Sequence, residues 1–228
     1  MSLQTIIDTA QTIEISRQAL VASSISRNGK MLTANRSWVK PWSFTVVPRP
    51  IWLFADFRGS IEDIFNNDRY KEQLIHLGAD NTAWLVAYQG ALTNVNLNNI
   101  TVIATLGNTI TFSCSDGLAA GTVLFRAGDI VQFAGLGSDS RGYRYPYVVK
   151  YDLIVPGTLG DIITSTPFTL NVNRGMILQA NFDPIGKPLR VGTACTWTVK
   201  VTKLPTMRYL PGKFVEFNGE FQMMESVV

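Results

Sequence analysis

Apolar and polar residues alternate in short runs from about residue 83 to the C-terminus. A period of two is typical of half-buried β-strands, because successive side chains point to opposite faces of a sheet. Turn residues separate these runs at spacings of about 8–12 residues, as in sandwiches and barrels. The pattern therefore predicts a mainly β fold for most of the chain, including strands at 83–92 and 92–99. The second of these would place a ladder of asparagine amides on one face.

Four dipeptides predict tight turns between such strands, because glycine, asparagine and aspartate tolerate a positive φ. They are Asn28-Gly29, Gly107-Asn108, Gly128-Asp129 and Asn218-Gly219. The first lies in a polar N-terminal segment and predicts a hairpin that extends as an arm. The last predicts a closing hairpin near the end of the chain.

Residues 59–78 carry the one clear helical pattern. Ser60 is suited to cap the helix, apolar residues recur at helical spacing, and Gly78 is a natural stop. The weak helix formers at 66–68 make two short helices an equal alternative. His76 would then lie near a helix C-terminus, where packing or the helix dipole explains it.

Two similar stretches lie far apart in the chain. KPWSFTVVP begins at Lys40 and CTWTVKVTKLP begins at Cys195, and each places a tryptophan before an alternating run that ends at a proline. We predict that Trp42 and Trp197 are buried in one domain, whose sheet takes strands from both ends of the chain. The alternative is that any half-buried strand has this pattern. Residues 119–155 read as a compact β unit of their own.

Composition narrows the functional classes. Charged residues make up 16% of the 228 residues, against roughly 25% in an average soluble domain. A low-charge surface suits contacts with other proteins, and it equally suits a β-rich surface of Thr, Asn and Ser. The net charge of +3 comes from scattered basic residues, which does not indicate a specific nucleic-acid site.

The sequence contains no recognisable catalytic motif. The chain has one histidine, lacks a G-x-S-x-G elbow, and has glycine-rich stretches without the lysine of a phosphate loop. Cys114 and Cys195 are too far apart in sequence for a typical zinc motif and are interpreted as buried free thiols, with a disulfide as the alternative. We therefore expect no enzyme activity, no catalytic residue, no metal and no cofactor. No signal peptide or apolar run of membrane-spanning length is found, so we expect cytoplasmic synthesis and no membrane.

Arginines and tyrosines are the candidate interface residues, because both types dominate protein–protein hot spots. One group lies in the predicted arm and the other in the stretch SRGYRYPYVVKY. They are Arg17, Arg27, Asn28, Arg141, Tyr143, Arg144, Tyr145 and Tyr147. The tyrosines also suit cross-strand packing, or stacking on sugars.

The order of these motifs resembles the small tail structural proteins of long-tailed bacteriophages, with the distal tail and baseplate-hub type of contractile tails as the nearest group. The residues that carry the likeness are SRNGK, KPWSFTVVP, NDRYKEQLIHLG, AWLVAYQGAL, NNITV, AGDIVQF, YPYVV and FNGEFQMMES. The likeness covers nearly the whole chain, although each motif is short.

The resemblance implies a β-barrel or sandwich ring domain with one helix, made of residues 1–84 and 181–228, and an inserted small β-barrel domain at 85–180. It implies a virion structural protein that forms a ring, hexameric or trimeric, between the tail tube and the baseplate. Its partners would be its own copies and other tail tube and baseplate proteins. The second domain is small for this family and has no obvious carbohydrate module. The alternative functions are a glycan-binding β-sandwich that uses Tyr143, Tyr145 and Tyr147, and a tail-fibre hydrolase, which the missing catalytic residues disfavour.

Overall fold

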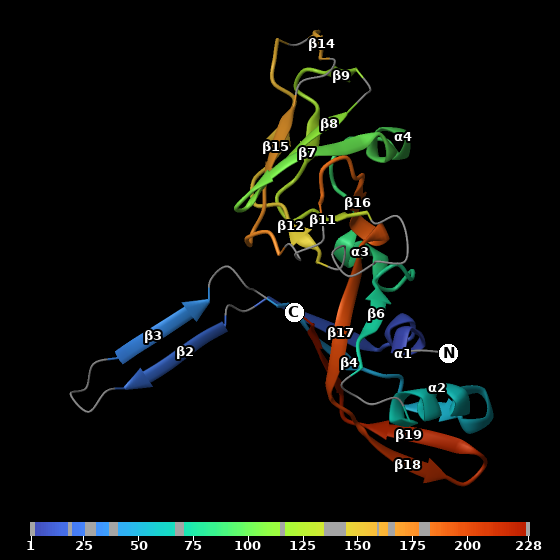
Figure 1. The fold of residues 1–228 in the computed structure, drawn as a ribbon. Helices are drawn as coiled ribbons and strands as arrows, with labels where there is room; N and C mark the ends of the chain where they lie inside the picture. Colours follow the sequence, from blue (N-terminus) through green and yellow to red (C-terminus); the bar gives the residue numbers. More distant parts are fainter. Residues whose placement is uncertain are drawn as a thin grey trace. The chain divides into compact units, whose positions relative to one another are not determined.

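The computed structural model describes residues 3–17, 20–25, 31–36, 41–66, 71–114, 117–134, 145–158, 160–163, 167–177 and 183–226. Of these, 46% lie in strands and 14% in helices, so the predicted mainly β fold is confirmed. The chain divides into two compact units (Figure 1). Unit 1 comprises Met1–Thr82 and Trp197–Val228, and unit 2 comprises Ala83–Thr196.

The second boundary lies at 196/197, whereas the sequence placed it at 180/181. Strand β16 (Leu189–Val191) pairs with β11 (Ile130–Phe133) inside unit 2. The buried Gln132 amide then accepts a hydrogen bond from Thr196 N at 2.9 Å and donates one to Thr196 O at 2.7 Å. These contacts hold the segment up to Thr196 in unit 2. They join residues about sixty positions apart, so the sequence pattern gave no sign of them.

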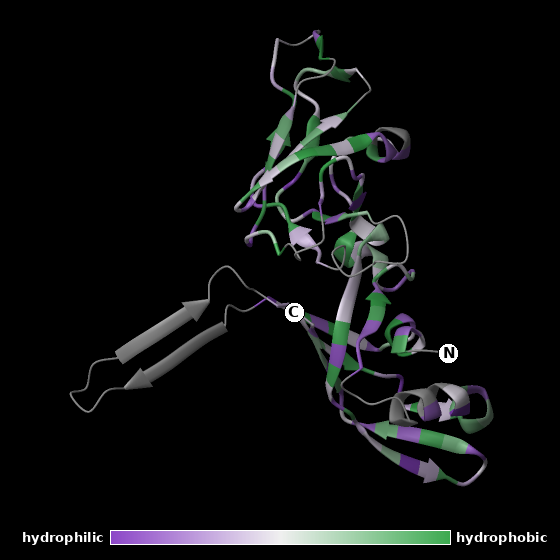
Figure 2. Ribbon diagram, in the orientation of Figure 1, coloured by the Kyte–Doolittle hydropathy of each residue, from purple (hydrophilic) through white to green (hydrophobic). Residues whose placement is uncertain are grey.

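The main sheet of unit 1 has five strands in the order β1-β4-β20-β17-β6. Their bounds are Thr12–Ser16, Ser43–Val47, Phe221–Glu225, Thr196–Lys203 and Gln73–His76. Strands from both ends of the chain therefore share one sheet, as predicted, and β20 lies between β4 and β17. Figure 2 shows hydrophobic and hydrophilic bands along β17 and β6 of this sheet. Closure into a barrel stays a prediction.

An aromatic cluster forms the centre of unit 1. Trp42 and Trp197 are 3% and 0% exposed, and their rings meet edge-on at 5.5 Å. Phe44 contacts Trp197 at 5.8 Å. The prediction that both tryptophans are buried in one domain is confirmed. Helix α1 (Leu3–Asp8), which the sequence analysis missed, adds buried side chains from Leu3, Ile6 and Ile7.

A second sheet of unit 1 has the order β18-β19-β5, with bounds Thr206–Leu210, Phe214–Asn218 and Ile51–Leu53. Helix α2 (Phe54–Asn66) covers one face: Phe57 lies 4.2 Å from the Trp52 ring and 6.0 Å from the Phe217 ring. The turn at Asn218-Gly219 exists, with Gly219 at φ +104°. The predicted closing hairpin is nevertheless wrong, because β19 and β20 join different sheets.

The predicted N-terminal arm is a two-stranded antiparallel sheet of β2 (Leu20–Ile25) and β3 (Met31–Arg36). The turn residues Asn28-Gly29 lie outside the described residues. Ser16 and Ser43 are direct partners in the β1–β4 pair, so the arm is inserted between two adjacent strand ends.

The helix predicted at 59–78 is partly wrong. Helix α2 begins at Phe54 and ends at Asn66, and residues 73–76 form strand β6. Exposure alternates there: Leu74 is 62% exposed, whereas Ile75 and Leu77 are each 1% exposed. The period is therefore two, and pairing with β17 selected the strand.

In the described residues of unit 2, the strands form four sheets of two or three strands each. Their orders are β10-β13, β12-β11-β16, β14-β9 and β15-β8-β7. The bounds not yet given are β7 Ile100–Leu106, β8 Thr109–Cys114, β9 Leu118–Ala119, β10 Val123–Phe125, β12 Tyr147–Val148, β13 Leu153–Ile154, β14 Ile162–Ile163 and β15 Phe168–Asn171. The hairpin predicted at Gly107-Asn108 is confirmed as β7–β8, with Gly107 at φ +59°.

The strands predicted at 83–92 and 92–99 are wrong. Residues Ala83–Val86 form the short helix α3, and Asn94–Asn98 form the short helix α4. The asparagines at 94, 96 and 98 therefore do not make a ladder on a strand. Asparagines and apolar residues alternate in this stretch, but the alternation did not specify a strand, and the backbone is helical.

Candidate functional site

Two carboxylates of unit 2 stabilise a turn. Asp129 is 2% exposed, and its Oδ1 and Oδ2 accept hydrogen bonds from Gln89 N and Arg126 N, each at 2.8 Å. Burial raises the pKa of the Asp129 carboxyl above its ordinary value, while these two N–H groups act in the opposite direction. Asp152 accepts from Ala127 N at 2.7 Å in the same turn. Both acids therefore hold the backbone and do not form an acid–base pair.

Both cysteines are buried thiols, which confirms their interpretation. The Cys195 Sγ lies 3.6 Å from the carbonyl oxygens of Ile130 and Arg190. Burial raises the pKa of the Cys195 thiol far above its usual range, so it is not a thiolate nucleophile. Within the described ranges, no three His, Cys, Asp or Glu side chains gather as metal ligands.

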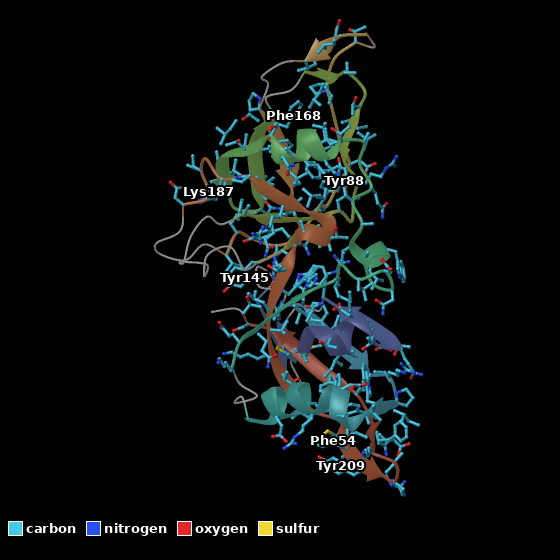
Figure 3. All side chains as sticks on the ribbon, turned by 90° about the vertical axis from the view of Figure 1, so that its right-hand side faces the viewer. Phe54, Tyr88, Tyr145, Phe168, Lys187 and Tyr209 are labelled. Carbon is cyan, nitrogen blue, oxygen red and sulfur yellow. The ribbon has the colours of Figure 1, made fainter. Side chains whose placement is uncertain are left out.

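Tyr145 and Tyr147 lie in the interior of unit 2, at 2% and 1% exposure. The Arg174 guanidinium lies 5.3 Å from the Tyr147 ring centroid and donates to Pro146 O at 2.6 Å. The Tyr147 hydroxyl accepts from Ile177 N at 3.0 Å. Figure 3 shows Tyr145 among the packed side chains of this unit. The packing interpretation therefore fits these two tyrosines, and neither presents a ring for a partner.

Of the remaining interface candidates, only Arg17 is among the described residues. It follows β1, and its guanidinium lies 4.9 Å from the Trp42 ring centroid. The candidates outside the described residues are Arg27, Asn28, Arg141, Tyr143 and Arg144.

A cavity of about 490 Å³ lies in unit 2 between α4 and the β16 segment. Asn94, Leu97 and Asn98 of the helix are among its lining residues, together with Arg190 and Thr193. Amides, a guanidinium and a hydroxyl can bind a polar molecule. They do not supply a nucleophile with a base beside it, so this cavity has no catalytic arrangement.

The feature with the clearest binding capacity is the β2–β3 arm. Its strands pair over six positions from Leu20↔Arg36 to Ile25↔Met31, and neither is hydrogen-bonded to any other strand in the described part of the chain. Each strand therefore has an outer edge of backbone N–H and C=O groups. Such edges are templates for pairing with another chain.

Sequence analysis missed a second open edge, which strand β18 forms in the sheet β18-β19-β5. The sequence did contain a signal for this strand, because Pro205 and Pro211 flank a short run there. Pro41 and Pro48 flank the strand in KPWSFTVVP in the same way.

No protein-family model matches the chain, and a search of curated proteins found no related sequence. Among the helices of the described residues, none has the length and apolar character needed to cross a bilayer.

Proposed function

We propose that this chain is a virion structural subunit of a phage tail or baseplate, which assembles with its own copies into a ring through the β2–β3 arm. The observation that carries the proposal is that the arm forms a two-stranded sheet of its own. The resemblance of the sequence motifs to distal tail and baseplate-hub proteins supports the tail setting.

A two-stranded ribbon is at best marginally stable alone in water, because it has little apolar surface to bury. A neighbouring chain can complete it by strand addition, in which backbone hydrogen bonds provide the affinity. Between residues 15 and 55 the chain carries arginine and lysine but neither aspartate nor glutamate. A partner surface for the arm therefore suits it best when it carries carboxylates.

The ring would hold three or six copies and would join the tail tube to the baseplate. The glycan-binding alternative has less support, because Tyr145 and Tyr147 are buried against Arg174. A hydrolase has less support too, because Asp129 and Asp152 hold a turn.

The test is to replace residues 18–40 with Asn-Gly. Ser16 and Ser43 are direct partners, so a short turn closes β1 and β4 without the arm. Removal of residues 1–35 would be a poorer test, because it also removes the buried side chains of α1. Sedimentation velocity should give three or six times 25.2 kDa for the full chain and a monomer for the excised chain.

The excised chain must keep the fluorescence of buried Trp42 and Trp197, which controls for folding of unit 1. A full chain that stays monomeric at all concentrations contradicts ring formation. An excised chain that still forms the same oligomer contradicts the role of the arm.

A further inference from the structure

The edge strand β18 of unit 1 has a determined hydrogen-bonding direction. Strand β19 lies between β18 and β5, and Phe217 N donates to Pro50 O at 2.9 Å on the β5 side. On the same side, Phe54 N donates to Lys213 O at 2.8 Å. In an antiparallel ladder, alternate residues of a strand bond to the same neighbour. Residues 213, 215 and 217 therefore face β5, and residues 214, 216 and 218 face β18.

The partners of those residues on β18 are Leu210, Arg208 and Thr206. Consistent with this phase, the Thr206 hydroxyl also donates to Asn218 O at 3.0 Å. The backbone groups of Met207 and Tyr209 consequently point away from β19, toward the open edge. Pro205 and Pro211 flank the strand and contribute no N–H. An added strand would thus find two donors, at Met207 and Tyr209, and would be confined to this length.

Three side chains of this edge strand are exposed, namely Thr206, Arg208 and the aromatic Tyr209. Tyr209 is 64% exposed, and its ring centroid lies 5.6 Å from that of Phe54 in α2. Figure 3 shows these two side chains next to each other. On the opposite face of the sheet, Phe214 of the neighbouring strand β19 is 41% exposed. Ile51 and Leu53 share that face but lie on β5, two strands away from this edge. Cross-strand neighbours on an added strand would cover Tyr209 and Leu210.

The two edges of the five-stranded sheet fit an incoming strand less well. On β6, the Gln4 side chain already donates to His76 O at 2.8 Å and accepts from His76 N at 2.9 Å. On β1, the exposed residues are Thr12 and Glu14, so a strand added there buries little apolar surface. Strand β18 combines outward backbone groups with the exposed rings of Tyr209 and, on the adjacent strand β19, Phe214.

We propose that β18 of one copy receives a strand of the β2–β3 arm of a second copy. This inference rests on the proposed function and names the acceptor site for the arm. The lengths match, since β2 and β3 have six residues each and β18 has five. The arm is free of acidic residues. On the acceptor side, Arg208 of β18 is paired with Glu216 of β19, so these two side chains together carry no net charge that would repel the arm.

Cross-linking between two populations of the full chain tests the acceptor directly. One population carries Ala22→Cys in the arm and the other carries Arg208→Cys on β18, and a short bis-maleimide joins them. Glu14→Cys on β1 replaces Arg208→Cys in the matched control. The native cysteines are buried. We expect a product of twice the chain mass with Arg208→Cys and its loss with Glu14→Cys. Equal or stronger cross-linking at Glu14 overturns the inference.

A second variant removes an outward donor. Tyr209→Pro deletes an N–H that β19 does not use, so the fold should persist, as the melting temperature and tryptophan emission will check. The assembly constant should fall about tenfold relative to Tyr209→Ala, because one intermolecular hydrogen bond is lost and proline obstructs the edge. Tyr209→Ala is the control, because it also removes the exposed ring but keeps the N–H.

The outcomes separate the two proposals. If excision of residues 18–40 abolishes the oligomer and Tyr209→Pro leaves it unchanged, the arm pairs elsewhere and only the β18 inference fails. If excision leaves the oligomer unchanged, the proposed role of the arm fails as well. If Tyr209→Pro unfolds the chain, the Arg208 and Glu14 cross-links decide.

Discussion

The two units of this chain are both made of β-strands but are held together differently. Unit 1 joins strands from both chain ends around the stacked and edge-on rings of Trp42, Phe44 and Trp197. Unit 2 has strands as short as two residues, and buried polar groups such as Asp129 and Arg174 connect its turns to neighbouring segments. Strands of two or three residues bury little apolar surface, so specific hydrogen bonds to the adjacent turns contribute to holding them.

This difference has a consequence for how each unit responds to substitution. Apolar burial is distributed over many contacts, so a cavity in unit 1 should weaken that whole unit. A polar group that satisfies two backbone donors acts at one place, and its loss leaves those donors buried and unpaired. Three predictions test the comparison.

The largest effect is expected for Trp197→Ala. The ring is fully buried and contacts both Trp42 and Phe44, so the free energy of unfolding of unit 1 should fall by about 3–5 kcal/mol. Urea unfolding followed by hydrogen exchange of unit 1 peptides measures it. Trp84→Ala, at a residue that is 70% exposed in unit 2, is the control of equal size. Similar losses for both variants would contradict an aromatic core in unit 1.

An intermediate effect is expected for Gly192→Ala in unit 2. Gly192 has φ +61°, and an added Cβ would lie 2.9 Å from Val86 O and 3.0 Å from Tyr88 N. Strain of the left-handed backbone and this close approach together should cost about 2–4 kcal/mol. Gly107→Ala has a similar φ of +59° with no atom within 4 Å and isolates the backbone term, at about 1–2 kcal/mol. Thermal unfolding of the two variants measures the difference in destabilisation. Equal destabilisation by Gly192→Ala and Gly107→Ala would contradict the close contact at Gly192.

The smallest effect is expected for Asp129→Asn. The variant keeps one acceptor oxygen for Gln89 N and Arg126 N and should lose about 1–3 kcal/mol in unit 2. Asp152→Asn, at an exposed residue with one such bond, should lose less.

The same residue predicts a pH dependence. Burial raises the pKa of Asp129 above its ordinary value of 3.8. Protonation of Asp129 therefore contributes stability that is fully present below pH 3.8 and is lost as the pH rises through the pKa of the folded state. Urea unfolding of unit 2 across this range should therefore show a decline that Asp129→Asn removes. An unchanged pH profile in the variant would show that Asp129 is not the titrating group.

The open strand edges show the limits of sequence reasoning about binding. The arm was predicted because Asn28-Gly29 and its flanking strands are a local signal. Strand β18 was missed, because its role depends on which strand pairs with β19 and on which side. Similarly, Tyr145 and Tyr147 were candidates for a surface, and the structure buries them against Arg174, which lies about thirty residues away in sequence.

The sequence alone determined those features whose causes are local or compositional. Period-two alternation specified a mainly β chain, Gly107-Asn108 specified the β7–β8 hairpin, and the two tryptophan strands specified a shared core. Tertiary structure decided the features in which several partners compete for one segment. Asn218-Gly219 turns the chain from one sheet into another, and residues 73–76 form a strand because β17 offers them a ladder. A short segment has similar free energies as helix or strand, and only distant contacts separate them.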